Sequence, residues 1–388
     1  RTACESFGDD LDAVAARLAA RAAGARVVLV GGASDGTRQF HALRARLTRL
    51  LLERAGFDML AVDGDAGCTS CGDPRAAPEW SVHNAETRGL MQWMRASRAS
   101  RPSLQVMGLD LFERVRSLRA ALRWMRRCDA QAARAAQLRY ASLTPWQSDP
   151  EAFSRASESA NLERLVPAMA EQLAEHSLRR LARAPWRDAV DAPLRAAMLR
   201  DARAHHAETL RGNAQSWSMR NRHLADALGA IWRSGVSTRK VVVWTSAPNA
   251  GHTGATEMGA RGAVSLGQLM RERLGSDAHL VGMGTHCGSV LVAGGWDGSP
   301  QVRALPESHH DSCERLLHAT GVPRFTLPLR RIPEGVVRDT LLPPRLQRFC
   351  GASYSPETEL PSHCYQASLK AQFDEYVWFD QTEALSLI

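Results

Sequence analysis

The sequence predicts an α/β protein with a mostly parallel sheet flanked by helices, and with a large all-helical insertion. Three observations favour this fold class. Short runs rich in β-branched residues alternate with segments of helical periodicity, as expected of strands joined by helices. One long stretch, residues 111–235, has almost no strand pattern and is rich in Ala, Leu and Arg. Polar side chains and glycines directly follow several of the apolar runs.

The predicted strands are short apolar runs bounded by Gly, Asp or Ser. The first, residues 26–31, leads through the turn of "VVLVGGASDGTRQF" into a helix expected over 38–55. A second helical pattern covers 264–275. The other predicted strands are 58–63, 105–109, 240–245, 279–284, 288–293, 324–329 and 375–379.

The predicted domain organisation is an α/β core formed by residues 1–110 and 236–388, interrupted by a helical insertion or cap over 111–235. With 388 residues, of which 44% are hydrophobic, the chain is long enough to bury a sizeable core. Prolines are expected to divide the insertion into separate helices. They are Pro145, Pro150, Pro185 and Pro193.

Composition and charge argue against several classes of function. No apolar run reaches the roughly 20 residues that cross a bilayer, so we expect no membrane association. The net charge is +8, but the arginines are spaced through helical segments beside acids, so we expect no nucleic-acid partner. Lysine occurs only at Lys240 and Lys370, and this preference for arginine is typical of GC-rich coding, as in actinobacteria. Eight dispersed cysteines and no leader-like start predict a soluble, cytoplasmic protein with reduced thiols.

No cofactor and no metal are expected. Cys68 and Cys71 form a lone CxxC, whereas a structural zinc needs four ligands, so inert thiols are favoured over a zinc site or a redox pair. The glycines of "GGAS" belong to neither GxGxxG nor GxxxxGK[ST], which argues against a nucleotide. The sequence does not predict an oligomeric state.

Polar groups follow the predicted strands at their carboxyl ends, which is where open parallel sheets bind ligands. We therefore expect one site at this edge of the sheet, although the convergence does not name the reaction. The groups are the turn 31–38, Asp63 and Asp65, Asp110, the loop 246–252, and Thr285 with His286.

Several of these residues allow a structural and a chemical interpretation. Asp35 is placed either to cap the following helix or to act as a base or cation ligand. Asp63 is favoured over Asp65 as a site carboxylate, and His252 is either a solvated loop residue or part of the chemistry. No GxSxG or HExxH motif is present, which argues against an ordinary serine hydrolase or zincin. His309 and His310 are expected to be exposed loop residues.

The order of these segments resembles the erythromycin esterase family, which also includes succinoglycan-biosynthesis-like proteins. The first turn of that family reads roughly Gly-Glu-Ala-Ser/Thr-His-Gly-Thr-x-Glu-Phe. Residues that fit this frame are Gly31, Ala33, Ser34, Gly36, Thr37 and Phe40. The segments "LRARLTRLLLERAGFDMLAVDGD", "TEMGARGAVSLGQLMRERLG" and "SCERLLHATGVPRFTLPLR" extend the likeness along the chain. "SWSMRNRHLADAL" is similar to a helix of the family and keeps Arg220 and His223.

The resemblance implies hydrolysis of a macrolactone ester by water that the turn histidine activates with nearby glutamates and histidines. This sequence departs at those positions. Gly32 occupies the position of a glutamate of the family, Asp35 that of the turn histidine and Asp63 that of the second-strand glutamate. Ser246-Ala247-Pro248-Asn249 replaces His-Asn-x-His. A carboxylate with a pKa of about 4 is a poorer base at neutral pH than an imidazole with one near 6.5, so we do not expect hydrolysis in the manner of the family.

Three hypotheses about function remain open. In the first, an enzyme with altered chemistry (cyclisation, elimination or acyl transfer) acts on a polyketide- or peptide-like natural product. The second is a non-catalytic protein that binds a small molecule or a partner. The third is a retained ester hydrolase that uses carboxylates. The catalytic candidates are Asp35, Asp63, His223 and His252. The candidates for substrate binding are Arg38, Trp217, Arg220, Ser246, Asn249, His286 and His363, with Arg38 and Arg220 expected to hold an anionic group or oxyanion.

Overall fold

A computed structural model describes residues 3–65, 84–110, 126, 131, 134, 215–233, 239–293, 299–351 and 354–387. The chain forms two compact units. The first contains residues 1–63, 77–107 and 239–388, and the second contains 64–76 and 108–238. Most of the predicted insertion, 111–235, and the Cys68–Cys71 pair lie outside the described residues, so the expectations about them stay predictions.

A nine-stranded sheet forms the centre of the described structure, in the order β1-β8-β11-β6-β2-β5-β3-β4, with β7 paired to β6. Its central pairs, β11 with β6, β6 with β2, β2 with β5 and β5 with β3, are parallel. The strands are β1 (Glu5–Ser6), β2 (Val27–Gly32), β3 (Met59–Asp65), β4 (Gln105–Asp110), β5 (Val241–Ser246), β6 (Ala278–Ala293), β7 (Pro300–Leu305), β8 (Arg324–Leu327) and β11 (Glu375–Thr382). β9 (Arg345–Arg348) and β10 (Cys364–Ala367) form a separate antiparallel pair.

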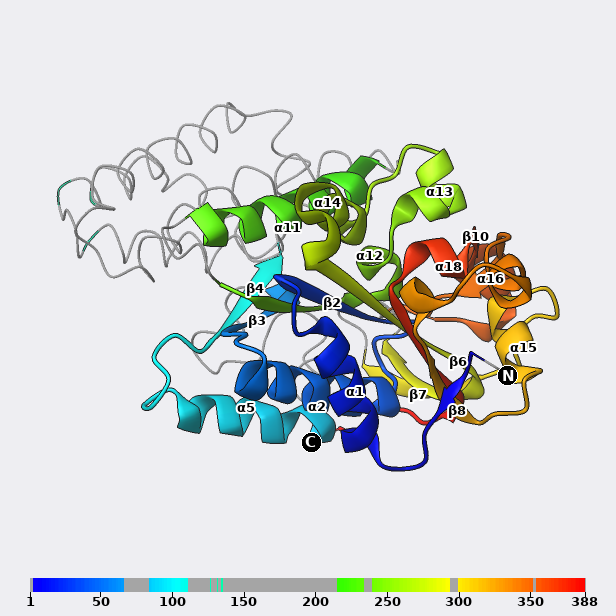
Figure 1. The fold of residues 1–388 in the computed structure, drawn as a ribbon, viewed down its shortest axis with the longest axis horizontal. Coiled ribbons are helices and arrows are strands. Elements are labelled where there is room, and N and C mark those ends of the chain that lie inside the picture. The colour runs from blue at the N-terminus through cyan, green and yellow to red at the C-terminus, as the bar shows by residue number, and fades with distance from the viewer. Residues whose placement is uncertain are drawn as a thin grey trace. The chain divides into compact units, whose positions relative to one another are not determined.

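Helices cover both faces of the sheet (Figure 1). α1 (Leu11–Ala22), α2 (Arg38–Arg54) and α5 (Ala85–Ser97) lie on one face, where Phe40, Leu43 and Leu47 of α2 pack against alternate strand residues such as Val28 and Val30. On the other face, α12 (Ala247–Ala250) and α14 (Leu266–Leu274) contact the strands. The other α-helices among the described residues are α11 (Gln215–Arg233), α13 (Glu257–Ala260), α15 (Cys313–His318), α16 (Val336–Leu341), α17 (Glu359–His363) and α18 (Leu369–Gln372).

The predicted α/β class, with a mostly parallel sheet and flanking helices, is therefore confirmed. One strand prediction was wrong. Residues 279–284 and 288–293 belong to a single strand, β6, which pairs in parallel with β2 and β11 in its first part and antiparallel with β7 from Gly288 onward. Gly288 has a φ of 135°, and a Cβ there would stand 1.9 Å from the Thr382 carbonyl oxygen, so only glycine fits where the pairing changes.

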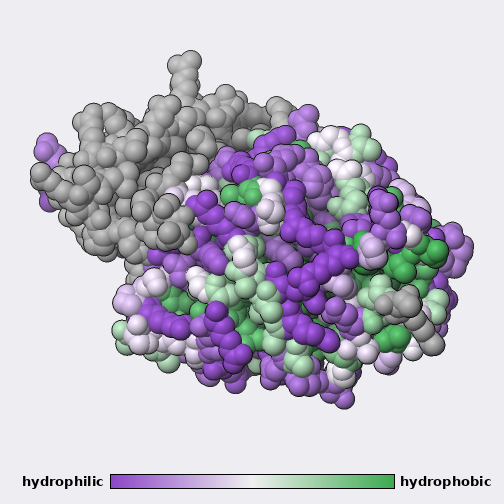
Figure 2. Space-filling view, in the orientation of Figure 1, coloured by the Kyte–Doolittle hydropathy of each residue, from purple (hydrophilic) through white to green (hydrophobic). Residues whose placement is uncertain are grey.

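The surface of the described residues is mainly hydrophilic in the view of Figure 2, and hydrophobic residues gather at the side where Figure 1 shows α15 and α16. Val336 of α16 is 82% exposed. None of the helices in the described part of the chain is both long enough and apolar enough to span a lipid bilayer.

Candidate functional site

The turn between β2 and α2 is held in one conformation by close backbone contacts. The Gly36 carbonyl accepts hydrogen bonds from the Leu291 and Leu385 N–H groups, both at 3.0 Å. A Cβ on Gly36 would stand 1.7 Å from the Leu291 carbonyl oxygen, so no other residue fits here. The Cys350 N–H also donates to the Ala33 carbonyl at 2.7 Å. The turn that carries Asp35 is thus preorganised by β6 and by segments far along the chain.

The helix cap does not use Asp35 as its first residue, because Thr37 occupies the N-cap position of α2. The carbonyl of Asp35 instead contacts the buried ring of His41, whose Nε2 lies 2.9 Å away. The capping interaction that was one of the two interpretations of Asp35 is therefore not the arrangement found.

His41 is a neutral support of the turn. Asn84 Oδ1 accepts a hydrogen bond from the Thr87 N–H at 3.0 Å, which turns the Asn84 amide NH₂ toward His41 Nδ1 at 3.4 Å. His41 Nδ1 must then accept, so Nε2 carries the proton and donates to Asp35. Burial, with a contribution from the charge of Arg44, lowers the pKa of His41 to about 3.

Arg44 places a buried positive charge beside the two candidate carboxylates. Its side chain projects from α2, is 4% exposed, and donates through Nη2 to the Thr245 carbonyl at the end of β5. Burial lowers the pKa of Arg44 to about 10, while the charges of Asp35 and Asp63 act in the opposite direction. A guanidinium in this position opposes the binding of a divalent cation by the two carboxylates.

Asp63 is oriented by two side chains from the neighbouring strand and helix. Its Oδ2 accepts a hydrogen bond from the Thr245 hydroxyl and another from Asn249 Nδ2 at 2.8 Å. Asn249 belongs to α12, which begins directly after Ser246. Gly31 allows α12 to lie this close to β2, since a Cβ at Gly31 would stand 2.6 Å from the Ala250 Cβ. Three adjacent strands, β2, β5 and β3, therefore contribute to one cluster.

The positions predicted at the carboxyl ends converge in part. Gly32 and Ser246 are register partners in β2 and β5, and Asp63 and Asn249 are hydrogen-bonded. Thr285 and His286 do not follow a strand as predicted but lie inside β6, because β6 continues beyond the end of β2. Asp65 and Asp110 are the last residues of β3 and β4, and their side chains lie outside the described part of the structure.

Other predicted residues have different surroundings. Arg38 is half exposed and forms ion pairs with Glu383 and, at 3.5 Å, with Glu86, so it joins α2 to α5 and to the C-terminal segment. Burial lowers the pKa of His252, and its charged neighbours are Glu272 and Arg271 of α14.

His363 and His286 each lie against another aromatic ring. The ring of His363 lies 5.0 Å from that of Tyr354, and His286 stacks on His318. Burial lowers the pKa of each.

Trp217, Arg220 and His223 lie on α11, which belongs to the second unit. Their spacing of three residues puts them along one side of the helix. His223 is buried, and Asn221 Nδ2 donates to the Trp217 carbonyl at 3.0 Å. A role for these residues in the site stays a prediction.

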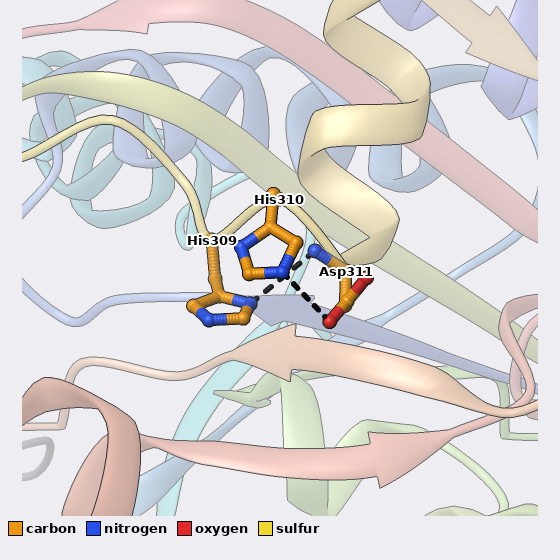
Figure 3. Close-up of side chains that lie close together, drawn as sticks. All are labelled: His309, His310 and Asp311. Carbon is orange, nitrogen blue, oxygen red and sulfur yellow. Dashed lines mark hydrogen bonds and ion pairs between the residues drawn. The ribbon is translucent and has the colours of Figure 1, made fainter.

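His309, His310 and Asp311 are the only group of three metal-ligating side chains within reach of one another among the described residues (Figure 3). They belong to a loop, as predicted for the two histidines, but only His310, 74% exposed, has the predicted exposure, because His309 is partly buried. The Asp311 N–H donates to His309 Nδ1 at 3.2 Å, and His310 Nε2 lies 3.0 Å from Asp311 Oδ2. One nitrogen of each histidine and one oxygen of Asp311 thus already have a partner within the loop.

Two residues of the cluster, Arg44 and Thr245, were missed by sequence reasoning. A signal existed for Arg44, because it stands in the apolar stripe of α2 between Leu43 and Leu47. In a chain with so many helical arginines, that position did not stand out. Thr245 is the penultimate residue of β5 and directly precedes the loop 246–252 in which the polar groups were predicted.

The fold and the cluster together define an α/β protein with a polar site at the carboxyl ends of a parallel sheet. The family described as erythromycin esterase matches residues 52–382, and the chain belongs to this family. The matched range begins after the turn that carries Asp35, so the exchange of catalytic residues at Gly32 and Asp35 stays a prediction.

Three solved structures have the same fold. A protein from Bacillus cereus aligns with a TM-score of 0.81 at 14% identity, over 100% of this chain and 97% of its own. A succinoglycan biosynthesis protein gives 0.76 at 17% identity, over 100% of this chain and 96% of its own. A mutant of the erythromycin esterase EreC in its open conformation gives 0.63 at 17% identity, over 95% of this chain and 93% of its own.

Proposed function

We propose that this protein is an enzyme that transfers protons with Asp35 and Asp63 on a small polyketide- or peptide-like substrate. The reaction is a cyclisation, an elimination or an acyl transfer rather than ester hydrolysis in the manner of the family. One observation carries the proposal: the Asp63 carboxylate is fixed by Thr245 and Asn249 next to buried Arg44, whose charge also interacts with Asp35.

The cluster has the parts that such chemistry requires. A carboxylate with a fixed orientation is able to take or return a proton when a reacting group lies within hydrogen-bonding distance. A buried guanidinium stabilises an oxyanion that develops during the reaction, because it is already oriented and little water screens it. Arg44 therefore offers the electrostatic part, and Asp35 and Asp63 the proton-transfer part.

Two buried polar atoms of the cluster favour a bound ligand. Asn249 Oδ1 and Arg44 Nε have no hydrogen-bond partner within the described residues. Buried polar atoms are nearly always paired, so unpaired ones call for an explanation such as an absent ligand or water. A substrate that donates to Asn249 and accepts from Arg44 would satisfy both.

The surroundings of the histidines support the move away from imidazole chemistry. Both ring nitrogens of His41 face hydrogen-bond partners, and its low pKa keeps the ring neutral at pH 7. His252 has α14 residues as its charged neighbours. Asp63, by contrast, bonds directly to residues at the end of β5 and the start of α12.

Mass spectrometry of the products tests the proposal. The protein is incubated with macrolactones, with linear hydroxy-acyl thioesters and with peptidyl thioesters. We expect a product formed without net addition of water, and a loss of roughly 10²-fold or more in rate for Asp35→Asn and for Asp63→Asn. Asp339→Asn, at an exposed position of α16, is the matched control and should keep the full rate.

Other outcomes would reject parts of this proposal. Opening of macrolactone rings with gain of one water would favour the retained hydrolase. Binding of a compound that is never converted, with the same affinity in both Asn variants, would favour a non-catalytic binding protein.

A further inference from the structure

A second cluster of titratable side chains joins α15 to the sheet and uses none of the residues around Asp63. The buried ring of His286, in β6, stacks on the ring of His318 at the end of α15, with centroids 3.8 Å apart and planes inclined by 14°. His318 is 38% exposed, so it covers His286 on the side of the solvent. The stack is therefore a direct contact between α15 and the sheet.

Hydrogen bonds fix the proton of His286. Its Nδ1 lies 2.7 Å from the Ser308 hydroxyl and 3.4 Å from the Ser308 backbone N–H. Because a backbone N–H only donates, Nδ1 accepts, and the proton of the neutral ring is on Nε2. A second proton on His286 would go to Nδ1 and would break the bond from the Ser308 N–H.

The two rings differ in their partners. His318 Nδ1 lies 2.7 Å from Asp380 Oδ1 in β11, so it donates to a carboxylate. The nearest carboxylate to His286 is that of Glu307, whose Oε2 is 3.9 Å from Nε2 and whose side chain is 69% exposed. A positive charge on the pair is therefore better compensated at His318 than at His286.

Charged groups surround His286 from α15, β11, β9 and the residue before Ser308. His318 and Arg315 of α15 oppose a positive charge on His286, while Asp380 of β11 and exposed Glu307 favour one. Burial and the charge of His318 together lower the pKa of His286, so the ring is neutral at pH 7. From β9, Arg348 Nη1 donates to the His286 carbonyl at 3.0 Å, which adds a further positive charge nearby.

We propose that His286 and His318 form a proton-operated clamp. While His286 is neutral, the stacked rings hold α15 and residues 306–312 on the sheet. When His286 is protonated, the charge of His318 at stacking distance opposes that of His286, and the Ser308 N–H loses its acceptor. α15 then separates from β6.

The clamp adjoins the turn that carries Asp35. Arg348 bonds to the His286 carbonyl and, through Nη2, to the Pro306 carbonyl at 2.9 Å. Two residues further on, the Cys350 N–H donates to Ala33 at 2.7 Å. Release of residues 306–312 therefore removes support from the segment 348–350, which begins at the last residue of β9 and holds this turn.

Hydrogen exchange at about pH 7.5 and about pH 5, on either side of the histidine reference pKa of about 6.5, tests the clamp. After correction for intrinsic rates, exchange over residues 306–319 should rise roughly tenfold or more in acid, the factor that one pKa unit represents. His318→Gln, which cannot become charged, should weaken this dependence, because the charge of His318 would no longer add to the effect of burial on His286. His310→Gln, on the exposed loop, should keep it.

Equal exchange at both pH values in the unmodified protein would overturn the proposal, as would an unchanged dependence in His318→Gln. NMR of the histidine side chains gives a second readout that needs no variant. At about pH 7.5, His286 should show the neutral Nε2–H form. A charged ring or an Nδ1–H form would also overturn the clamp, whether or not the variants fold.

Discussion

A single residue, Arg44, determines the charge balance of the candidate site. It is one of many arginines in the sequence, yet its guanidinium is buried at the end of β5 and the carboxylates of Asp35 and Asp63 both interact with it. Gly32 adds to this arrangement, because a Cβ there would stand 3.3 Å from Arg44 Nη2. A larger residue at position 32 would therefore compete with Arg44 for space.

Replacement of Arg44 by methionine should lower the free energy of unfolding by about 1–3 kcal/mol at neutral pH, because the Thr245 carbonyl loses its charged donor and two carboxylates lose a compensating charge. Urea unfolding at neutral pH measures the loss. Arg44→Lys keeps the charge and should lose less stability than Arg44→Met, whereas an equal loss in the two variants would contradict the electrostatic account.

The helices and strands that the sequence predicted are those whose apolar periodicity lies within the segment itself. The apolar period of residues 38–55 corresponds to α2, which spans Arg38–Arg54, and the predicted strand 240–245 corresponds to β5, which spans Val241–Ser246. β6 was predicted as two strands, because its continuity through His286 and Gly288 depends on which strands pair with it. β7 was missed because it is an exposed edge strand with little apolar pattern.

Prediction of the candidate site likewise depended on whether a residue is placed by local sequence or by contacts between distant segments. The carboxyl-end rule placed Asp63 and Asn249 at one edge of the sheet, and the two are hydrogen-bonded. The rule did not find Arg44, which reaches the strand ends from the second turn of α2, because its place in the apolar stripe of the helix does not by itself show which groups the side chain contacts. Local sequence therefore predicts which strands supply the site, while three-dimensional packing decides which helical side chain completes it.

Lys240 joins the C-terminal ends of two helices, and a substitution tests this role. Its Nζ donates to the Ala23 carbonyl at 2.7 Å and to the Ala55 carbonyl at 3.1 Å, at the C-caps of α1 and α2. A positive charge there compensates the negative ends of both helices. Lys240→Met should lower the free energy of unfolding by about 1–3 kcal/mol.

Chemical denaturation measures this effect. Arg303→Met, at an exposed position of β7, removes a charge of the same sign and should change stability by less than about 0.5 kcal/mol. Equal losses in the two variants would show that net charge, rather than the capping of α1 and α2, explains the result.

For the first unit as a whole, buried titratable groups act on stability in opposite directions as the pH changes. Burial lowers the pKa of His41 to about 3 and that of His279 to about 4. Burial raises the pKa of Glu375 to about 7, despite its ion pair with Arg21 at 2.6 Å. Between about pH 4.5 and 6.5, the two histidines bind protons mainly in the unfolded chain, whereas Glu375 binds one mainly in the folded protein.

The sum of these proton-binding differences predicts that the free energy of unfolding increases with pH over this range. Two protons favour the unfolded chain and one favours the folded protein, so the free energy of unfolding should rise by the order of 1 kcal/mol per pH unit between about pH 4.5 and 6.5. His252, His286 and His363, whose pKa values are also lowered, act in the same direction as the two histidines. Denaturant titrations at several pH values measure the slope.

Single variants separate the opposing contributions. His41→Gln keeps a donor for the Asp35 carbonyl and should flatten the slope, because one group that binds its proton only after unfolding is gone. Glu375→Gln should steepen it, because the group that binds its proton mainly in the folded protein is gone. If Glu375→Gln leaves the slope unchanged, the ion pair with Arg21, rather than burial, sets the protonation of Glu375. The histidines alone would then determine the loss of stability in acid.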